Sequence, residues 1–368
     1  MKYFILIISL LFPLHLTAQW ATNVSTPQHL VVDSHDNIFV TRQYGMAKIA
    51  PDGTAIDLSK KVAQGKGLDR AWHALIIDSK DNLYAHDGNM IYKIRVSDDN
   101  VVTMTRFAGQ DGYKLLDGPL SIAAFNTIGH MAIDRSDNIY LTDSYDKIKD
   151  QIGTNFVTDS YYLDDPAKKY LKYPGRNYSI VRKISSGGIV STLKTPDGKY
   201  VLPNKVNGMT IDLDGNIIFT SQSFGRFVGK IDISSGAIML VAGLPYKREW
   251  CPVYTQGDIS RAEFVEPQTV IVNKKGEILV ADERINRIMK IANGKVSTLA
   301  GGNIIDPCSQ NIGGRSQEGN RDGKAFTALF NFPKGMAYDS KGNLFIADMN
   351  NHSVRKLSPD GIVSTFAK

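Results

Sequence analysis

The sequence has few of the features that mark common enzyme and nucleic-acid-binding families. Its 368 residues include only two cysteines, Cys251 and Cys308, so at most one disulfide can form within the chain. There is no Gly-x-Ser-x-Gly, His-Glu-x-x-His, phosphate-binding loop or dinucleotide-binding signature. The net charge of +6 is spread along the chain without a Lys/Arg block, which argues against a nucleic-acid partner.

Long apolar segments are also scarce. One apolar stretch covers residues 3–16, follows Met1-Lys2 and leads to the small residue Ala18. It is too short for a comfortable membrane span and is typical of a secretory signal peptide. We therefore expect a signal peptide over residues 1–18 and no membrane span. The mature chain, residues 19–368, should be exported to the periplasm or the extracellular space.

The two cysteines occupy equivalent places in the sequence. Each follows an Ala-Gly pair by a few residues, at Ala242-Gly243 and Ala300-Gly301. Export permits a disulfide between Cys251 and Cys308. The alternative is two separate buried thiols.

A short pattern recurs six times along the chain. An apolar run ends in Asp or Asn, a polar turn follows, and a second apolar run comes next. The six copies cover residues 30–40, 75–84, 131–141, 209–219, 270–280 and 336–346. Short strands repeated at this period predict a ring or a stack of small sheets.

The last copy can be divided into four strands joined by polar turns. They cover residues 335–339, 343–347, 353–357 and 362–366. Apolar runs bounded by Asp-Gly and Asp-Asn turns indicate hairpins, and repeated four-stranded sheets indicate a β-propeller. We therefore predict an all-β, single-domain, six-bladed β-propeller with four antiparallel strands per blade. The expected blades cover about residues 27–58, 71–109, 125–195, 203–243, 264–301 and 330–368.

The last two copies carry a more specific signature. Residues 333–348, read with Asn350-Asn-His-Ser-Val-Arg-Lys356, resemble an NHL repeat, and the fifth copy is similar at Ala281-Asp282 and Asn286-Arg287-Ile288. The other copies match more loosely. The chain thus resembles the NHL-repeat propellers of a secreted bacterial type. This resemblance implies a rigid disc, but NHL propellers include both binding scaffolds and a few enzymes.

The strand order assigns the connections to two faces of the disc. The links between first and second strands are all tight, and they share one face. The long segments should gather on the opposite, loop-rich face; they are residues 109–129, 143–178, 243–267 and 301–333. Long loops on a rigid scaffold are usually functional or disordered.

Polar residues recur five places before the Asp or Asn that ends each first strand. We expect them at the rim of the central channel, on the loop-rich face, as a ligand-binding set. The set is Gln28, His73, Asn207, Gln268 and Lys334, with Gly129 in the third copy. The alternative is that polar side chains line the channel because it is filled with water.

Three histidines near the starts of the first strands are candidate metal ligands. His29 and His130 lie one position later in the repeat than His73, and one step along a strand reverses the side-chain direction. The resemblance to propeller lyases implies a Pro-His at the rim of alternate blades, and His73 alone matches. Resemblance to calcium-dependent lactonases rests on Asn207 alone. We therefore predict no metal and no cofactor; zinc or calcium in the channel is not supported.

An acidic residue closes four of the second strands. These are Asp87, Asp143, Asp282 and Asp348. We interpret each as a cap for the turn that follows, and Asp348 as a partner for Arg355. Arg42 and Ser221 stand in two of the other copies, so no complete acidic ring exists.

Aromatic residues are concentrated in two long loops. One loop holds Tyr246, Trp250 and Tyr254, and another holds Tyr161 and Tyr162. Aromatic faces beside polar groups suit sugars or peptide side chains. The alternative is that these rings pack the loops onto the disc.

We therefore expect an exported scaffold that recognises an extracellular glycan or protein through its loop-rich face. Nothing in the sequence demands catalysis. The alternative is a lactonase- or lyase-type enzyme at the channel mouth. His73 would then act as a base, with Lys334 or Asn207 polarising the substrate.

Overall fold

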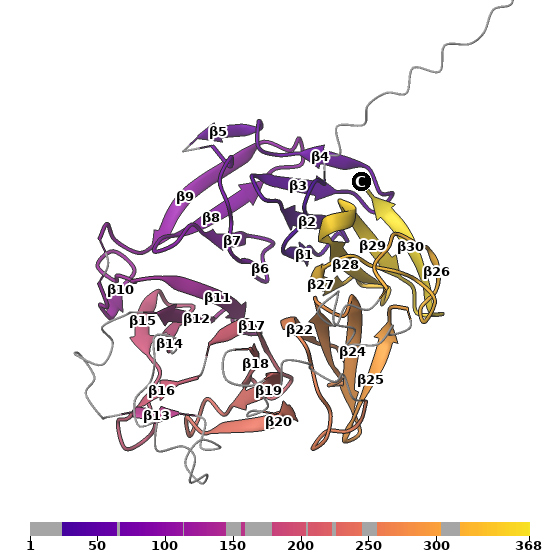
Figure 1. The fold of residues 1–368 in the computed structure, drawn as a ribbon. Helices are drawn as coiled ribbons and strands as arrows, with labels where there is room; N and C mark the ends of the chain where they lie inside the picture. Colours follow the sequence, from indigo (N-terminus) through magenta and orange to yellow (C-terminus); the bar gives the residue numbers. More distant parts are fainter. Residues whose placement is uncertain are drawn as a thin grey trace, which may run out of the picture.

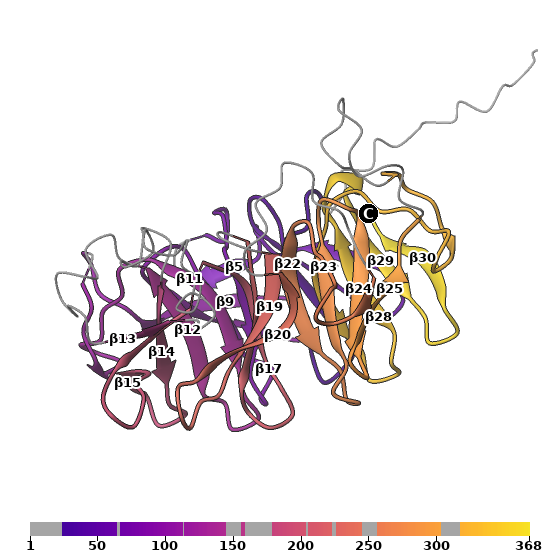
Figure 2. The ribbon, with the colours of Figure 1, turned by 60° about the horizontal axis from the view of Figure 1, so that its bottom comes forward.

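The chain folds as six sheets around a central axis (Figure 1). The computed structural model describes residues 24–64, 67–112, 114–144, 156–158, 179–203, 205–222, 226–244, 256–302 and 317–368. Seen from the side, the strands run between the two faces of a disc (Figure 2). The prediction of a six-bladed, all-β propeller is confirmed.

Each blade contains four antiparallel strands in sequence order, as predicted. The innermost strands are β1 (Leu30–Val32), β6 (Leu75–Ile77), β11 (Ile128–Ile133), β17 (Val206–Ile211), β22 (Pro267–Val272) and β27 (Pro333–Tyr338). The second strands are β2 (Ile38–Thr41), β7 (Leu83–His86), β12 (Ile139–Ser144), β18 (Ile217–Ser221), β23 (Ile278–Asp282) and β28 (Leu344–Asp348). The third strands are β3 (Met46–Ile49), β8 (Ile91–Val96), β14 (Ser179–Ile184), β19 (Arg226–Ile231), β24 (Arg287–Ala292) and β29 (Ser353–Leu357). The outer strands are β4 (Ala55–Asp57), β9 (Val102–Ala108), β15 (Ile189–Thr192), β20 (Ile238–Leu244), β25 (Lys295–Ala300) and β30 (Ile362–Ala367).

Four blades add a fifth strand at the outer edge, which the sequence did not predict. In blades 3, 5 and 6 this strand belongs to the preceding link and pairs antiparallel; it is β10 (Gly118–Pro119), β21 (Gly257–Asp258) or β26 (Gly323–Lys324). In blade 2, β5 (Val62–Gln64) pairs parallel with β9. Two short strands, β13 (Phe156–Thr158) and β16 (Tyr200–Leu202), form a separate parallel pair, and a 3-10 helix, η3 (Met349–Asn351), follows β28.

The links that supply these edge strands also fill the spaces between blades. The links before blades 3, 5 and 6 each carry a phenylalanine that is at most 1% exposed: Phe125, Phe264 or Phe330. Phe264, for example, packs among Val228 of blade 4 and Val280 of blade 5. Burial of such rings is the main favourable term in folding. The hydrophobic core is therefore divided among the interfaces between neighbouring blades.

The tight turns between first and second strands are closed by an aspartate in five blades. In blade 6, Asp339 Oδ1 accepts the Asn343 backbone N–H at 2.8 Å, and Oδ2 accepts the Asn343 side-chain amide at 2.7 Å. Similar turns in blades 1 to 3 place Asp36, Asp81 and Asp137 at positive φ. Aspartate tolerates this conformation because its short side chain bonds to nearby backbone.

Exposed Ser–Asp clasps join the tight turns of neighbouring blades. Ser34 donates its backbone N–H and its hydroxyl to Asp81, at 3.0 and 2.6 Å. Equivalent pairs join Ser79 to Asp137, and Ser340 to Asp36. The clasps therefore run from blade 6 through blades 1 and 2 to blade 3.

Among the described residues, the ring closes without a blade that combines strands from the two ends of the chain. Every blade is built from one continuous stretch of sequence, and β1 lies beside β27. The Gly335 N–H donates to the Gln28 carbonyl at 2.8 Å, and the Ser340–Asp36 clasp spans the same junction. Val24 is fully buried in a cluster that includes Phe345 of blade 6.

Blades 3 and 6 each contain a buried arginine that pairs with two aspartates near the loop-rich face. Arg355 donates to Asp348 of β28 at 2.8 Å and to Asp322 at 2.5 Å, just before β26. In blade 3, Arg182 bridges Asp143 and Asp117 in the same way, both at 2.9 Å. Both guanidinium groups are fully buried. The predicted pairing of Asp348 with Arg355 is confirmed.

For Asp143 and Asp282, the expectation that the aspartate mainly caps the following turn is wrong, whereas Asp348 accepts the Asn351 side-chain amide of the turn after it. Asp143 Oδ1 accepts backbone N–H groups of Asn126 and Thr127, both at 3.0 Å, and Asp282 accepts those of Val265 and Glu266. These donors lie on the link that enters the blade. The side chains therefore fasten that link to the sheet, because its backbone groups would otherwise be buried without partners.

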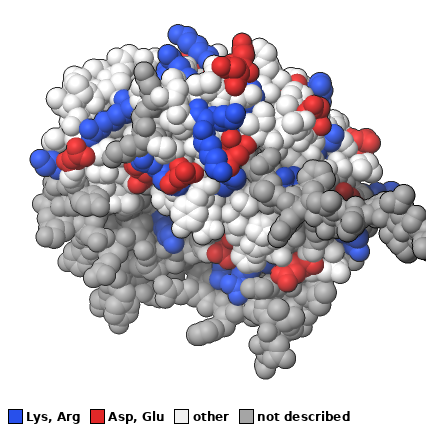
Figure 3. Space-filling model, turned by 90° about the horizontal axis from the view of Figure 1, so that it is seen from above, with Lys and Arg blue, Asp and Glu red and all other residues white. Residues whose placement is uncertain are grey.

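The described residues contain no helix long and apolar enough to cross a membrane. On the face in Figure 3, Lys and Arg side chains are interspersed with Asp and Glu.

Candidate functional site

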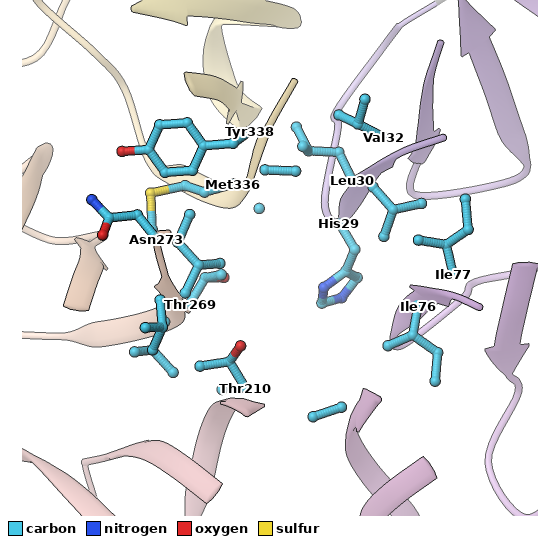
Figure 4. Close-up of a pocket in the computed structure, with 18 of the residues that line it drawn as sticks. His29, Leu30, Val32, Ile76, Ile77, Thr210, Thr269, Asn273, Met336 and Tyr338 are labelled. Carbon is cyan, nitrogen blue, oxygen red and sulfur yellow. The ribbon is translucent and has the colours of Figure 1, made fainter. Parts of the chain in front are cut away.

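The inner strands of all six blades enclose a central cavity of about 860 Å³. Its walls are mainly apolar and include Leu30, Ile76 and Met336 (Figure 4). At the loop-rich end, which we call the mouth, the lining side chains include His29, His130 and Asn207; at the opposite, tight-turn end they include three lysines. A concave, largely apolar site with a few polar groups is the usual form of a small-ligand pocket.

Of the predicted rim residues, only Asn207 lines this cavity. Residues one position later line it instead in all six blades: His29, Ala74, His130, Gly208, Thr269 and Gly335. In blades 3, 5 and 6 the first strand carries a register shift that spans this position, and in blade 4 the shift lies just before it. Such a bulge re-aims the side chains beside it. A ligand-binding role for Gln28, His73, Gln268 and Lys334 stays a prediction.

His29 and His130 present neutral imidazoles to the cavity. Burial, followed by the proximity of His130 and Lys334, lowers the pKa of His29 to about 3. Burial, followed by His73, lowers the pKa of His130 to about 4. A neutral imidazole offers one N–H donor and one nitrogen acceptor. Within the described residues neither ring hydrogen-bonds to another side chain or to the backbone, so both can serve a ligand.

His86, which the sequence reasoning missed, is a structural neighbour of this pair. Its Nε2 donates to the Gly129 carbonyl at 2.9 Å, and its Nδ1 accepts the Gly88 N–H at 3.3 Å. Burial lowers its pKa to about 3. Both ring nitrogens are therefore occupied. His73 is exposed, and its ring centroid lies 5.7 Å from that of His86.

Gly129 occupies the third-blade rim position because a side chain would not fit there. A Cβ at Gly129 would lie 2.6 Å from the Thr142 hydroxyl. The same residue exposes its carbonyl to the His86 ring. The gap in the predicted polar rim is therefore a packing requirement between β11 and β12.

A chain of polar side chains runs from Asn207 along blades 4 and 5. The Asn207 amide donates to Gln222, and the Gln222 amide donates to Glu266 Oε1 at 2.8 Å. Glu283 lies nearby, 7% exposed, and its Oε2 has no hydrogen-bond partner among the described residues. Burial raises the pKa of Glu283, although Lys334 lowers it. Gln222 and Glu283 each follow the last residue of a second strand, a regularity that could have been read from the sequence.

Lys334 and Gln28 join blades 6 and 1 at the mouth. The Lys334 ammonium donates to Gln28 Oε1 at 3.1 Å, and the Gln28 amide donates to Met349 Sδ at 3.3 Å. Gln268 contributes its backbone carbonyl, which accepts the Thr220 hydroxyl at 2.5 Å. These three predicted residues therefore make contacts between blades or within the mouth wall.

The remaining predictions fall outside the described residues. They are the signal peptide, the Cys251–Cys308 pair and the aromatic residues Tyr161, Tyr162, Tyr246, Trp250 and Tyr254. Among the residues that are described, no three or more His, Cys, Asp or Glu side chains are grouped as metal ligands.

Sequence comparisons identify related proteins. Residues 226–358 match the family model of the teneurin NHL domain. NHL repeat-containing protein 2 of Gallus gallus is 26% identical over 149 residues, covering 39% of this chain and 19% of that protein. Protein SUPPRESSOR OF QUENCHING 1 of Arabidopsis thaliana is 25% identical over 291 residues, covering 67% and 26% respectively. The chain thus spans about a fifth to a quarter of the length of these curated relatives.

Solved structures share the fold. An auxiliary nutrient binding protein from Bacteroides ovatus superposes with a TM-score of 0.59 at 13% identity, covering 94% of this chain and 70% of that chain. At this identity the likeness shows the fold alone. The ring and its cavity define a six-bladed β-propeller. The NHL family match over residues 226–358 and the NHL relative confirm the resemblance to NHL-repeat propellers noted in the sequence. The secreted bacterial type stays a prediction.

Proposed function

We propose that this protein is an exported recognition scaffold that binds the end of an extracellular glycan or protein at its loop-rich mouth. The observation that carries the proposal is the cavity of about 860 Å³ that opens between His29, His130 and Asn207. The disc supplies rigid walls, and rigid walls reduce the entropy lost on binding. The Bacteroides ovatus neighbour is named a nutrient binding protein, in keeping with such a role.

Between the two ligand classes, the mouth chemistry favours a glycan. Neutral imidazoles and a primary amide offer both donors and acceptors, as sugar hydroxyls require. The apolar wall just below, including Leu30 and Met131, can receive a sugar's C–H face. The carboxylates at the mouth are joined to other side chains or buried, so they leave no strong charge for the ligand to neutralise.

The test is a glycan array probed with the mature chain and with a variant whose cavity is filled. Thr210 lines the cavity and is drawn beside it in Figure 4. We expect Thr210→Phe and His130→Ala to weaken binding of the strongest array glycan at least tenfold. The matched control is Thr105→Phe on the exposed side of β9, which should bind normally. Equal binding by all four proteins would reject the mouth as the site.

A second candidate function, a lactonase- or lyase-type enzyme, rests on Glu283. A buried carboxyl with a raised pKa and an unpartnered oxygen is a common setting for a general acid or base. In this case His73 would act as base, with Lys334 or Asn207 polarising the substrate. Turnover of a lactone panel that is lost in Glu283→Gln or His73→Ala would establish it. A recognition scaffold predicts no turnover, with capture reduced in Trp250→Ala.

A further inference from the structure

A second cavity lies between blades 5 and 6, beyond the predicted ligand mouth. It measures about 280 Å³ and is walled by apolar side chains of both blades and of the link between them: Leu299, Ala325, Phe326, Leu344 and Leu357. Tyr338, Gly342 and Pro359 line this cavity and the central one alike, so the two spaces adjoin at the tight-turn end. We call the smaller space the side groove. Phe326 at its outer edge is 63% exposed.

Three lysines surround the place where the two spaces adjoin. Lys274, Lys275 and Lys341 come from the tight turns of blades 5 and 6, line the central cavity and are exposed. Among the described residues, none of the three ammonium groups has a carboxylate within 4.0 Å. The nearby carboxylates are already engaged: Glu277 with Lys290 and Asn273, and Asp339 with Asn343.

This positive corner exists because blade 5 departs from the turn pattern. Five turns begin with Asp, but this one begins with Asn273, and Gly276 stands where blades 1 to 3 have Asp. Lys274 also replaces the clasp serine of blades 1, 2 and 6. Glu277 stands where the other five turns have Asn, so this turn keeps one carboxylate. With Lys274 and Lys275 its formal charge is +1, whereas the formal charges of the other five turns lie between −2 and 0.

We propose that this corner binds an amphipathic anion, specifically a long-chain carboxylate. The tail lies in the side groove against Leu344 and Leu357, and the carboxylate lies between Lys274 and Lys341. The apolar wall excludes a sugar or a free phosphate as the main occupant, because neither would bury apolar surface there. Charge complementarity selects an anion over a fatty alcohol or amine. The site is separate from the mouth, so this proposal does not depend on whether a glycan binds at the mouth.

Isothermal titration of the mature chain with dodecanoate, decanoate and dodecanol tests this proposal. Dodecanoate should bind about tenfold more tightly than decanoate, because each buried methylene strengthens binding about fourfold at most. The double variant Lys274→Gln, Lys341→Gln should bind dodecanoate about tenfold more weakly, since each exposed charge contributes up to about a fivefold effect. Its affinity for dodecanol should be unchanged. The matched control, Lys80→Gln with Arg135→Gln in the turns of blades 2 and 3, should bind dodecanoate normally.

Variants of the groove test the tail position. Ala325→Phe should fill the side groove and abolish binding, while Phe326→Ser, at an exposed position that keeps the core intact, should weaken it severalfold. His130→Ala at the mouth should have no effect. The proposal would be overturned if dodecanoate did not bind, or if its affinity were unchanged by the two lysine substitutions. Loss of dodecanoate binding in His130→Ala would also overturn it. The last result would assign the anion to the mouth, and failure here leaves the glycan proposal standing.

Discussion

Aspartates hold backbone segments in place at both faces of the disc, but their exposure to solvent differs between the two faces. At the tight-turn end, Asp36 is only partly buried, and hydrogen bonds from Ser340 lower its pKa. Near the loop-rich face, Asp143 and Asp282 are fully buried, and burial raises the pKa of each to about 6. A buried carboxylate depends on its partners far more than an exposed one does. Stability should therefore depend most on the groups that hold the links below the loop-rich face.

The largest effect should come from breaking a buried pair. Arg355→Met leaves Asp348 and Asp322 without their cation, and removing one partner of a buried pair typically costs about 3–5 kcal/mol. We expect this loss in the free energy of unfolding, measured by urea denaturation. The control is Lys356→Met, one residue away, whose ammonium lies over the Phe366 ring and which should cost less than about 1 kcal/mol. A loss below about 1 kcal/mol in Arg355→Met would contradict the comparison.

Acid should destabilise the mouth through its histidines. The pKa of His86 is about 3 in the folded chain, below the ordinary value of 6.5, so the unfolded chain binds more protons between these values. Stability is then complete above pH 6.5 and falls as the pH is lowered toward 3, by up to about 1.4 kcal/mol per pH unit. His86→Gln keeps a donor and an acceptor and should show a shallower slope in urea titrations from pH 6.5 to 4. An unchanged slope would show that His86 does not contribute to acid destabilisation.

Asp282 changes stability in the opposite direction. Its folded-state pKa of about 6 lies above the ordinary value, so the folded chain binds more protons between about pH 4 and 6. This group favours folding at the acid end of that window and loses that advantage as the pH rises. Asp282→Asn should therefore make acid destabilisation steeper. A shallower acid slope would show that the link N–H groups keep Asp282 ionised.

The smallest effect should come from an exposed clasp. Asp81→Ala removes two hydrogen bonds from Ser34 and should cost about 1 kcal/mol, because solvent competes for both partners. Asp214→Ala, in the turn of blade 4, removes an exposed carboxylate that forms no clasp among the described residues and should cost less. Thermal melting of the two variants checks this difference. Equal melting temperatures would show that the clasp adds no stability.

The sequence predicted the repeated strands well because their signals are local. In blade 6, for example, the apolar runs Met336–Tyr338 and Leu344–Ile346 are separated by a short polar turn. The hydrogen bond between Asp339 and Asn343 closes that turn within the repeat. The two-residue edge strands were missed because their partners lie far away in sequence: Gly118, for example, pairs with Val190. A span of two residues has no periodicity to detect.

The site was only partly predictable for a related reason. Of the residues that the repeat placed at the channel rim, Asn207 lines the cavity, whereas in blade 3 the strand irregularity between Ile128 and Met131 leaves His130 and not Gly129 lining it. Glu283 lies near Glu266 and near Lys334 of the next blade, and no local pattern encodes that proximity. The three-lysine cluster, in contrast, could have been predicted in part from the sequence, because the turn of blade 5 begins Asn273-Lys274-Lys275 where the other five turns begin with Asp.

The central claim is that the channel mouth is the recognition site. Crystals of the mature chain, soaked with the strongest glycan of the array, test it most directly. The account predicts a sugar ring within hydrogen-bonding distance of His29, His130 or Asn207. A glycan bound on the rim of the disc, with the central cavity empty, would contradict it.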